Sequence, residues 1–150
     1  DAELQAVSAL GREHPRAMLV QWQIHAARKL WAEALALAER MVKRWPKHPG
    51  GWIHRSYALH ELGHTTEAYA LLLPALERFR DEWVIPYNLA CYATKLGDLE
   101  LARRWLAEAA KRGEPAHLRR VALEDEDLKP LWPEIENWPN PPTSQKTSLS

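Results

Sequence analysis

Three short stretches of the sequence decide how the chain is expected to fold: Trp31-Ala32-Glu33-Ala34-Leu35, Thr65-Thr66-Glu67-Ala68-Tyr69 and Leu99-Glu100-Leu101-Ala102-Arg103. The fourth residue of each is an alanine, and these alanines are 34 residues apart. Gly63 and Gly97 repeat at the same spacing. A fixed period of this length predicts a stack of similar units, each a helix, a turn and a second helix.

Apolar residues recur in steps of three and four along the chain, which predicts amphipathic helices. We expect three helix pairs, at about residues 15–48, 49–82 and 83–116. A glycine allows the tight turn within the second and third pairs, whereas Lys29 has that place in the first. Thr65 and Asp98 are expected to cap the helices that follow them, because their side-chain oxygens can accept a free backbone N–H.

Prolines add further boundaries. Pro15 and Pro86 suit the first turn of a helix, where the missing N–H has no partner. Pro46 and Pro49 are expected to end the first pair. Pro74 lies inside a helical pattern, so a lost hydrogen bond and a bend are expected there.

The ends of the chain complete a single domain over residues 1–138. Leu4, Val7 and Leu10 predict one short helix within residues 1–14 that packs on the adjacent part of the chain. A closing helix at 116–123 and an irregular cover at 124–138 are expected to cap the stack. The anchors of this cover are Leu128, Leu131 and Trp132. Residues 139–150 are expected to be a disordered tail.

Composition excludes several functions. Lys and Arg total 20 and so do Asp and Glu, so no net positive field attracts nucleic acid or anionic membranes. One cysteine provides neither an internal disulfide nor a zinc framework. Apolar runs are too short to span a bilayer and no signal peptide is visible, so we expect a cytoplasmic protein.

The chain resembles the tetratricopeptide repeat (TPR) family over about residues 15–116. The resemblance is carried by a large residue early in the first helix of a pair, a small residue where the helices cross, a glycine at the turn and an alanine in the second helix. In the second unit these are Trp52, Ser56, Gly63, Ala68 and Ala75; in the third, Asn88-Leu89-Ala90-Cys91-Tyr92, Leu96-Gly97-Asp98 and Ala102. The first unit departs from the pattern at Trp22 and Lys29. The resemblance implies a right-handed α-α superhelix.

The same resemblance implies a concave surface, lined by the first helix of each pair, that binds a peptide or protein segment. The predicted peptide-binding residues are Leu19, Gln23, His54, Tyr57, Glu61, Tyr87, Asn88, Cys91 and Lys95, with Val20, Ala27 and Ile53 beside them. Tyr57 and Tyr87 could instead pack in the core between repeats. The basic residues that clamp a terminal carboxylate in some members of the family are missing, which argues against that ligand class.

No catalytic site, cofactor or metal site is expected. His60-Glu61-Leu62-Gly63-His64 matches a zinc-hydrolase motif, which requires both histidines on one continuous helix. Gly63 is expected to end that helix, so His64 leaves it. Cys91 is expected to be a small buried residue. The acidic run from Glu124 to Asp127 predicts either a solvated loop or the N-cap of a last turn.

The tryptophans fall into three predicted groups. Trp22, Trp52 and Trp105 are expected in the core, and Trp31 and Trp45 at helix ends. Trp83, Trp132 and Trp138 flank prolines near junctions; the last two either pack on the last helix or form an exposed partner patch.

The function expected from the sequence is that of a non-catalytic protein-interaction module, a monomer or weak dimer. The alternative is a small chaperone or adaptor of a secretion or assembly complex, which would dimerise through its N-terminal helix. An enzyme is disfavoured.

Overall fold

The computed structural model describes residues 14–138, and every regular element in this range is helical, so the all-α prediction is confirmed. The described residues fall into two compact units, residues 14–78 (unit 1) and residues 79–138 (unit 2). The helix expected at 1–14 and the tail expected at 139–150 lie outside the described residues. Organisation as one domain stays a prediction. Within residues 14–138 no helix is both long and apolar enough to cross a membrane.

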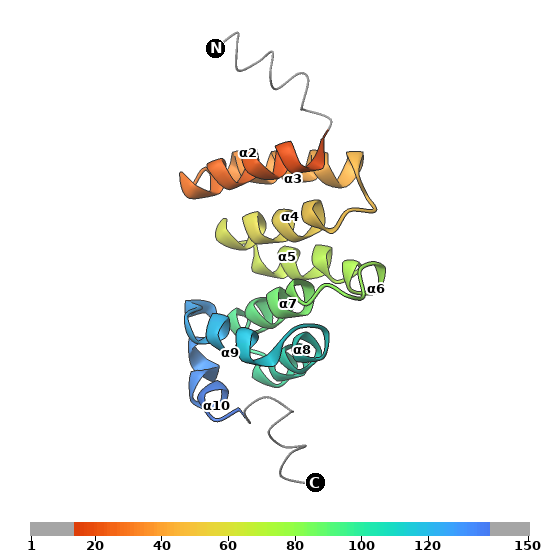
Figure 1. The fold of residues 1–150 in the computed structure, drawn as a ribbon. Helices are drawn as coiled ribbons and strands as arrows, with labels where there is room; N and C mark the ends of the chain where they lie inside the picture. Colours follow the sequence, from red (N-terminus) through yellow and green to blue (C-terminus); the bar gives the residue numbers. More distant parts are fainter. Residues whose placement is uncertain (1–13, 139–150) are drawn as a thin grey trace. The chain divides into compact units, whose positions relative to one another are not determined.

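Unit 1 contains both helix pairs that the sequence predicts for it. In each pair the second helix packs against the first, and α3 also packs against α4, so the helices follow one another in chain order (Figure 1). The described helices are α2 (Pro15–Ala27), α3 (Trp31–Arg44), α4 (Pro49–Glu61), α5 (Thr65–Leu72) and α6 (Ala75–Arg78).

The turns of the two pairs have the same geometry. Gly63 has φ 88°, and Lys29, 34 residues earlier, has φ 58°, which is also in the left-handed region. The backbone N–H of the following residue donates to a carbonyl five residues earlier in both turns, Leu30 to His25 at 2.8 Å and His64 to Leu59 at 2.9 Å. The turn predicted at Lys29 is therefore confirmed, although a lysine occupies it.

Two helices of unit 1 begin with a histidine cap that the sequence analysis did not identify. The Nδ1 atoms of His14 and His48 each accept a backbone N–H two residues later, at 3.1 Å, and a proline follows each histidine. Pro49 therefore begins α4, and the prediction that it ends the preceding helix is wrong. That helix ends at Arg44, before Pro46.

Two further predictions need correction. Pro74 divides its helix into α5 and α6 instead of only bending it, because it has no backbone N–H to continue the helical hydrogen bonds. Leu73 before it keeps helical dihedral angles, with φ −52° and ψ −44°. The N-cap of α5 is His64, one residue before the predicted Thr65. The Thr65 hydroxyl lies 2.9 Å from His60 Nδ1.

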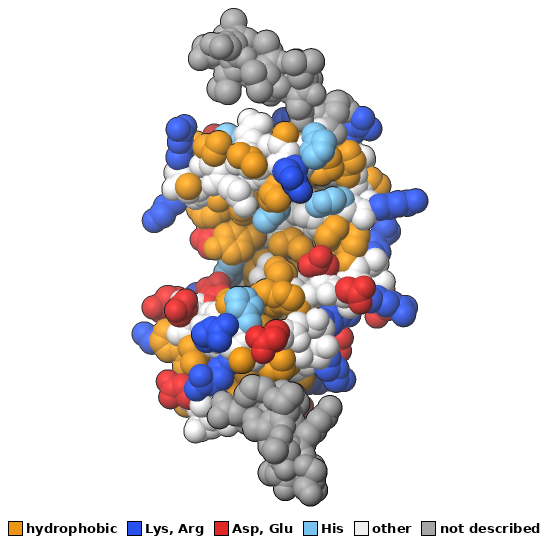
Figure 2. All heavy atoms as spheres, in the orientation of Figure 1, with side chains coloured by type: hydrophobic (Ala, Val, Ile, Leu, Met, Phe, Trp, Pro, Cys, Tyr) orange, Lys and Arg blue, Asp and Glu red, His pale blue; other side chains and the backbone are white. Residues whose placement is uncertain are grey.

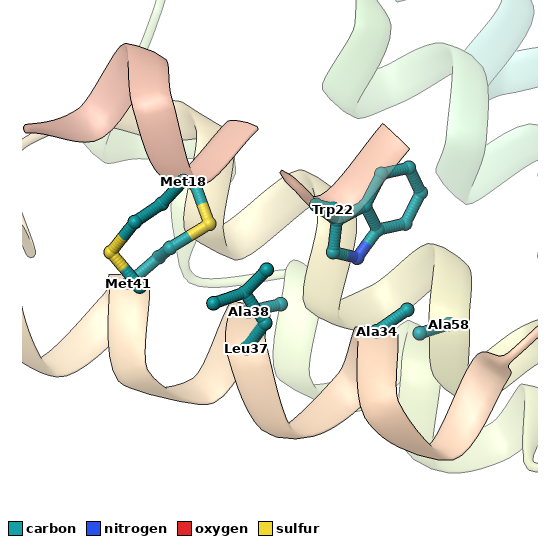
Figure 3. Packing of buried hydrophobic residues seen from close by; sticks show 7 residues of the cluster. All are labelled: Met18, Trp22, Ala34, Leu37, Ala38, Met41 and Ala58. Atoms are coloured by element: carbon teal, nitrogen blue, oxygen red, sulfur yellow. The ribbon is translucent and has the colours of Figure 1, made fainter. Parts of the chain in front are cut away.

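The core of unit 1 lies where α2, α3 and α4 meet. Met18 and Met41 face one another across α2 and α3, and Trp22 lies near Ala34 and Ala58 (Figure 3). Small residues at this meeting point leave room for the indole, whose side chain is only 6% exposed. Trp22 and Trp52 are buried as predicted, and Trp31 and Trp45 pack, partly buried, against the core.

Unit 2 contains the third predicted pair and its cap: α7 (Val84–Lys95), α8 (Leu99–Arg112), α9 (Pro115–Leu123), the 3-10 helix η1 (Glu126–Leu131) and α10 (Trp132–Glu136). Helix α7 packs on α8, and all its residues from Ile85 to Thr94 are buried. Gly97 makes the turn with φ 87°, and Asp98 caps α8 by accepting the Leu101 N–H at 3.1 Å, as predicted.

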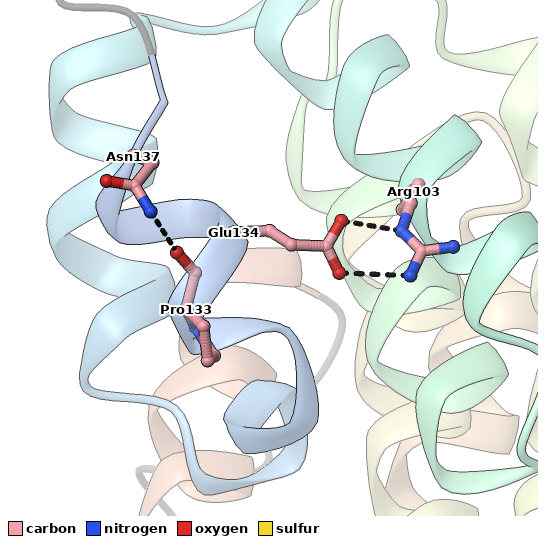
Figure 4. Close-up of polar contacts among 4 residues, drawn as sticks. All are labelled: Arg103, Pro133, Glu134 and Asn137. Atoms are coloured by element: carbon pink, nitrogen blue, oxygen red, sulfur yellow. Dashed lines mark hydrogen bonds and ion pairs between the residues drawn. The ribbon is translucent and has the colours of Figure 1, made fainter.

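The predicted cover closes unit 2. Leu128 and Leu131 are buried, and the Trp132 indole N–H donates to the Ala122 carbonyl at 2.9 Å, so all three anchors are confirmed. Arg103 of α8 holds Glu134 of α10 through two hydrogen bonds of 2.7 and 3.0 Å (Figure 4). The other three tryptophans, including Trp105, which was expected in the core, are half-buried: Trp83, Trp105 and Trp138.

Candidate functional site

The residues predicted to bind a peptide lie in different environments in the two units. In unit 1 three are exposed and two half-buried; in unit 2 three are buried and one exposed. The exposed ones are Gln23, Tyr57, Glu61 and Lys95, the half-buried ones Leu19 and His54, and the buried ones Tyr87, Asn88 and Cys91. Each unit therefore presents its own candidate surface.

Four ring side chains from three helices of unit 1 form one group, the aromatic cluster: Trp22, Trp31, His54 and Tyr57. The Trp22 and His54 rings stack with centroids 4.1 Å apart. Tyr57 lies with its ring centroid 6.1 Å from that of Trp22 and 5.7 Å from that of Trp31. Separations of 4.5–7 Å with tilted rings are favourable for aromatic pairs. The cluster extends from the buried core to the surface at Tyr57, which is 37% exposed.

His54 is a neutral member of this cluster at physiological pH. Burial, with a smaller effect of the nearby His48, lowers the pKa of His54 from 6.5 to about 4. A neutral imidazole can stack as an aromatic ring while keeping one N–H donor and one acceptor nitrogen. The cluster is therefore an uncharged aromatic surface and does not act as a cationic site.

Exposed hydrophobic and histidine side chains lie close together on the face of unit 1 seen in Figure 2. Among the large hydrophobic side chains of unit 1, Val20, Ile24 and Leu30 are each between 39% and 50% exposed, and Val20 and Ile24 lie one turn apart on α2. Exposed large hydrophobic side chains grouped on one face indicate a surface that another segment covers.

An arginine pair on Trp52 was missed by the sequence analysis. The guanidinium carbons of Arg55 and Arg78 lie 5.1 and 5.0 Å from the centre of the Trp52 ring, which is the range of a cation–π interaction. The Arg55 side chain also donates to the Leu71 carbonyl at 3.0 Å. The three-residue step from Trp52 to Arg55 on one helix was the available signal for the first contact.

In unit 2, two of the residues predicted to bind a peptide are already in contact with another residue of the chain. The Tyr87 hydroxyl donates to Asp125 Oδ2 at 2.7 Å, and the Cys91 thiol lies 3.6 Å from the same oxygen. Burial raises the pKa of both Tyr87 and Cys91, so both stay protonated. A peptide could use them only by displacing Asp125. Their role in peptide binding thus stays a prediction, while the burial of Cys91 is confirmed.

The contacts of Asp125 also decide between the two interpretations of the acidic run, a solvated loop or the N-cap of a last turn. Its other carboxylate oxygen accepts the Asp127 N–H at 3.1 Å at the start of η1. The capping interpretation is therefore the correct one for this residue. No spacing rule pointed to its contact with Tyr87, because the two residues are 38 positions apart.

The histidine motif does not have the geometry of a zinc hydrolase. Helix α4 ends at Glu61 and Gly63 has a positive φ, so His64 lies outside the helix that holds His60, as expected. His60 is buried and His64 is exposed. Within the described part of the chain no three His, Cys, Asp or Glu side chains are placed to hold a metal ion together.

A scan against models of known protein families finds no match to this chain, and a comparison with curated proteins finds none either. The resemblance to tetratricopeptide repeats therefore rests on the residues and their 34-residue period.

Proposed function

We propose that the chain is a non-catalytic interaction module of the tetratricopeptide type that binds a protein or peptide segment on unit 1. The observation that carries the proposal is the aromatic cluster, in which Tyr57 reaches the surface while Trp22 is buried beneath it. Aromatic side chains supply large contact areas and dominate the energetics of protein interfaces. An anchor whose position is fixed by packing also loses little freedom on binding.

The groups around Tyr57 favour a peptide ligand. His54 offers one donor and one acceptor, and exposed Gln23 and Glu61 supply further polar groups. A peptide backbone needs donors and acceptors of both kinds, and its apolar side chains can cover the exposed part of Tyr57. We assign Leu19 a supporting contact, because it is half-buried on α2 in the same unit.

The proposal includes a right-handed superhelix in which the first helix of each pair lines a concave surface, and a cytoplasmic location. The superhelix is supported by the repetition of one turn geometry at Lys29, Gly63 and Gly97, which are 34 residues apart. Similar units joined by similar turns stack with a constant rotation. Asn88 and Lys95 of unit 2 remain predicted peptide-binding residues, separate from the surface proposed on unit 1.

Selection from a displayed peptide library tests the proposal. The wild-type protein should enrich peptides that bind Tyr57→Ala at least about tenfold more weakly, because loss of a central aromatic anchor typically costs more than 1.4 kcal/mol. Leu73→Ala is the matched control, since Leu73 is 40% exposed, lies in unit 1 and is not part of the cluster.

Helical circular dichroism must first show that all variants are folded. Tyr57→Phe keeps the ring packing against Trp22 and Trp31, so it should retain most of the binding. Equal affinity of the selected peptides for wild type and Tyr57→Ala would overturn the assignment of the site.

A further inference from the structure

Two helices of the chain present equivalent faces, and one of these faces is covered while the other is open. The 34-residue period relates α4 to α7, so that Asn88 has the position of His54, and Cys91 that of Tyr57. Cys91 is 3% exposed, whereas Tyr57 is 37% exposed. The covered face on α7 therefore shows what kind of segment lies against this side of the repeat.

The segment that covers α7 consists of η1 and the aspartate that begins it. Helix η1 packs on α7 within unit 2. Asp125 Oδ1 accepts the Asp127 N–H at 3.1 Å and so closes the first turn of the segment. Asp125 Oδ2 accepts the Tyr87 hydroxyl at 2.7 Å and lies 3.6 Å from Cys91 Sγ. Leu128, three residues after the aspartate, is fully buried. One carboxylate thus shapes the segment and also attaches it to the helix.

Unit 1 has the charge and the side chains to bind a segment of this kind. Its described part has nine Lys and Arg against five Asp and Glu, so it attracts a segment that carries carboxylates. His54 keeps one N–H that a carboxylate oxygen can accept, and the Tyr57 ring offers apolar surface to a leucine. The acid in such a segment is a side chain. The missing basic residues that would clamp a terminal carboxylate therefore do not argue against it.

The two faces differ in the size of the side chain at one position, because Tyr57 is larger than Cys91. The ring of Tyr57 packs against those of Trp22 and Trp31, with centroids 6.1 and 5.7 Å away. A segment bound to unit 1 therefore covers the exposed side of this ring and does not repeat the contact made at Cys91. The kind of segment carries over from unit 2, and its register does not.

We propose that the ligand of the unit 1 site is an acidic segment of a partner protein that forms a single helical turn. It begins with an aspartate and has a leucine three residues later, as Asp125 and Leu128 do in this chain. The aspartate closes the turn, and the leucine covers Tyr57. The inference rests on the proposed peptide site and narrows the class of its ligand.

A blocked, fluorescently labelled peptide with the sequence of residues 124–131 tests the proposal, titrated into the full chain and followed by anisotropy. It should bind the wild type and the control Leu73→Ala equally, and Tyr57→Ala at least about tenfold more weakly. Two altered peptides should also bind the wild type about tenfold more weakly or worse. One carries Asp125→Ala and cannot close the turn, and the other has the same composition in an order that separates the aspartates from the leucines.

The remaining outcomes each overturn the proposal. Equal binding of the reordered peptide would show that charge alone attracts the segment. Weaker binding to Tyr87→Phe but not to Tyr57→Ala would show that the peptide replaces the chain's own segment in unit 2. Absence of binding to the wild type would exclude this ligand class. If library peptides then still bind in a manner that depends on Tyr57, the proposed function stands and only the inference about its ligand fails.

Discussion

Units 1 and 2 contain the same helix–turn–helix pattern but differ in what covers the first helix of the pair. In unit 2 every residue of α7 from Ile85 to Thr94 is buried, and Asp125 binds Tyr87 there. In unit 1 α4 keeps Tyr57 partly exposed. The difference arises because η1, which lies outside the repeat, packs on α7, the first helix of the pair in unit 2. The 34-residue repeat therefore determines where the helices form. Segments that lie outside the repeat determine which helix faces remain exposed.

Charge separates the two units as well. The described part of unit 1 has nine Lys and Arg against five Asp and Glu, whereas that of unit 2 has nine against twelve. A net charge of zero for the whole chain thus conceals a basic unit and an acidic one. Since complementary charge accelerates association, the proposed site on unit 1 should favour segments that carry Asp or Glu.

Acid should weaken unit 1 through His54, and this is the largest effect we expect. The pKa of His54 is about 4 in the folded chain and about 6.5 when unfolded, so the unfolded chain takes up the proton first as the pH falls. The contribution is complete above pH 6.5 and is lost between pH 6.5 and 4. The free energy of unfolding should fall by up to about 3 kcal/mol over this window.

Urea unfolding at pH 7, 5.5 and 4 measures this loss, and His54→Phe is the control. Phenylalanine preserves a ring stacked on Trp22 but does not titrate, so the pH dependence should be shallower in the variant. If wild type and His54→Phe lose stability in parallel, the loss comes from other groups and His54 is not buried as a neutral ring.

The equivalent weak point of unit 2 is the hydrogen bond between Tyr87 and Asp125. Tyr87→Phe should lower the free energy of unfolding by about 1–3 kcal/mol, because it leaves a partly buried carboxylate without its nearest donor. Asp125→Asn keeps an oxygen acceptor and a good N-cap, so it should cost less. Denaturant unfolding monitored by helical circular dichroism compares the two, and a loss below about 0.5 kcal/mol for Tyr87→Phe would contradict the structure.

The helices could be predicted from the sequence because their turns and caps depend on residues only a few positions apart. The turns at Gly63 and Gly97 and the cap at Asp98 follow from backbone geometry and from oxygen atoms a few positions away. The caps at His14 and His48 were missed because histidine is not a usual capping residue, although both repeat at 34 positions before a proline.

The candidate site was only partly predictable, because its environment depends on contacts between distant residues. Tyr57 and Tyr87 gave the same sequence signal, and the choice between surface and core depended on whether a later segment covers the helix. Asp125 lies 38 positions from Tyr87, and no periodic rule connects them. Contacts between residues so far apart in the sequence depend on how the whole chain folds, and the 34-residue repeat does not predict them.

The turn at Lys29 offers the smallest and cleanest test of how similar the units are. Lys29 has φ 58° where Gly63 and Gly97 have 88° and 87°. A side chain in this region costs about 1–2 kcal/mol, offset in part by the greater freedom of glycine in the unfolded chain. Lys29→Gly should therefore raise the free energy of unfolding by roughly 0.5–1 kcal/mol, while Gly63→Ala and Gly97→Ala should each lower it by about 1 kcal/mol. Denaturant unfolding of the three variants measures the expected gain in the free energy of unfolding and the two expected losses. A loss of stability in Lys29→Gly would mean that the first turn is not equivalent to the other two, and the 34-residue correspondence of α2 with α4 would then lose one of its supports.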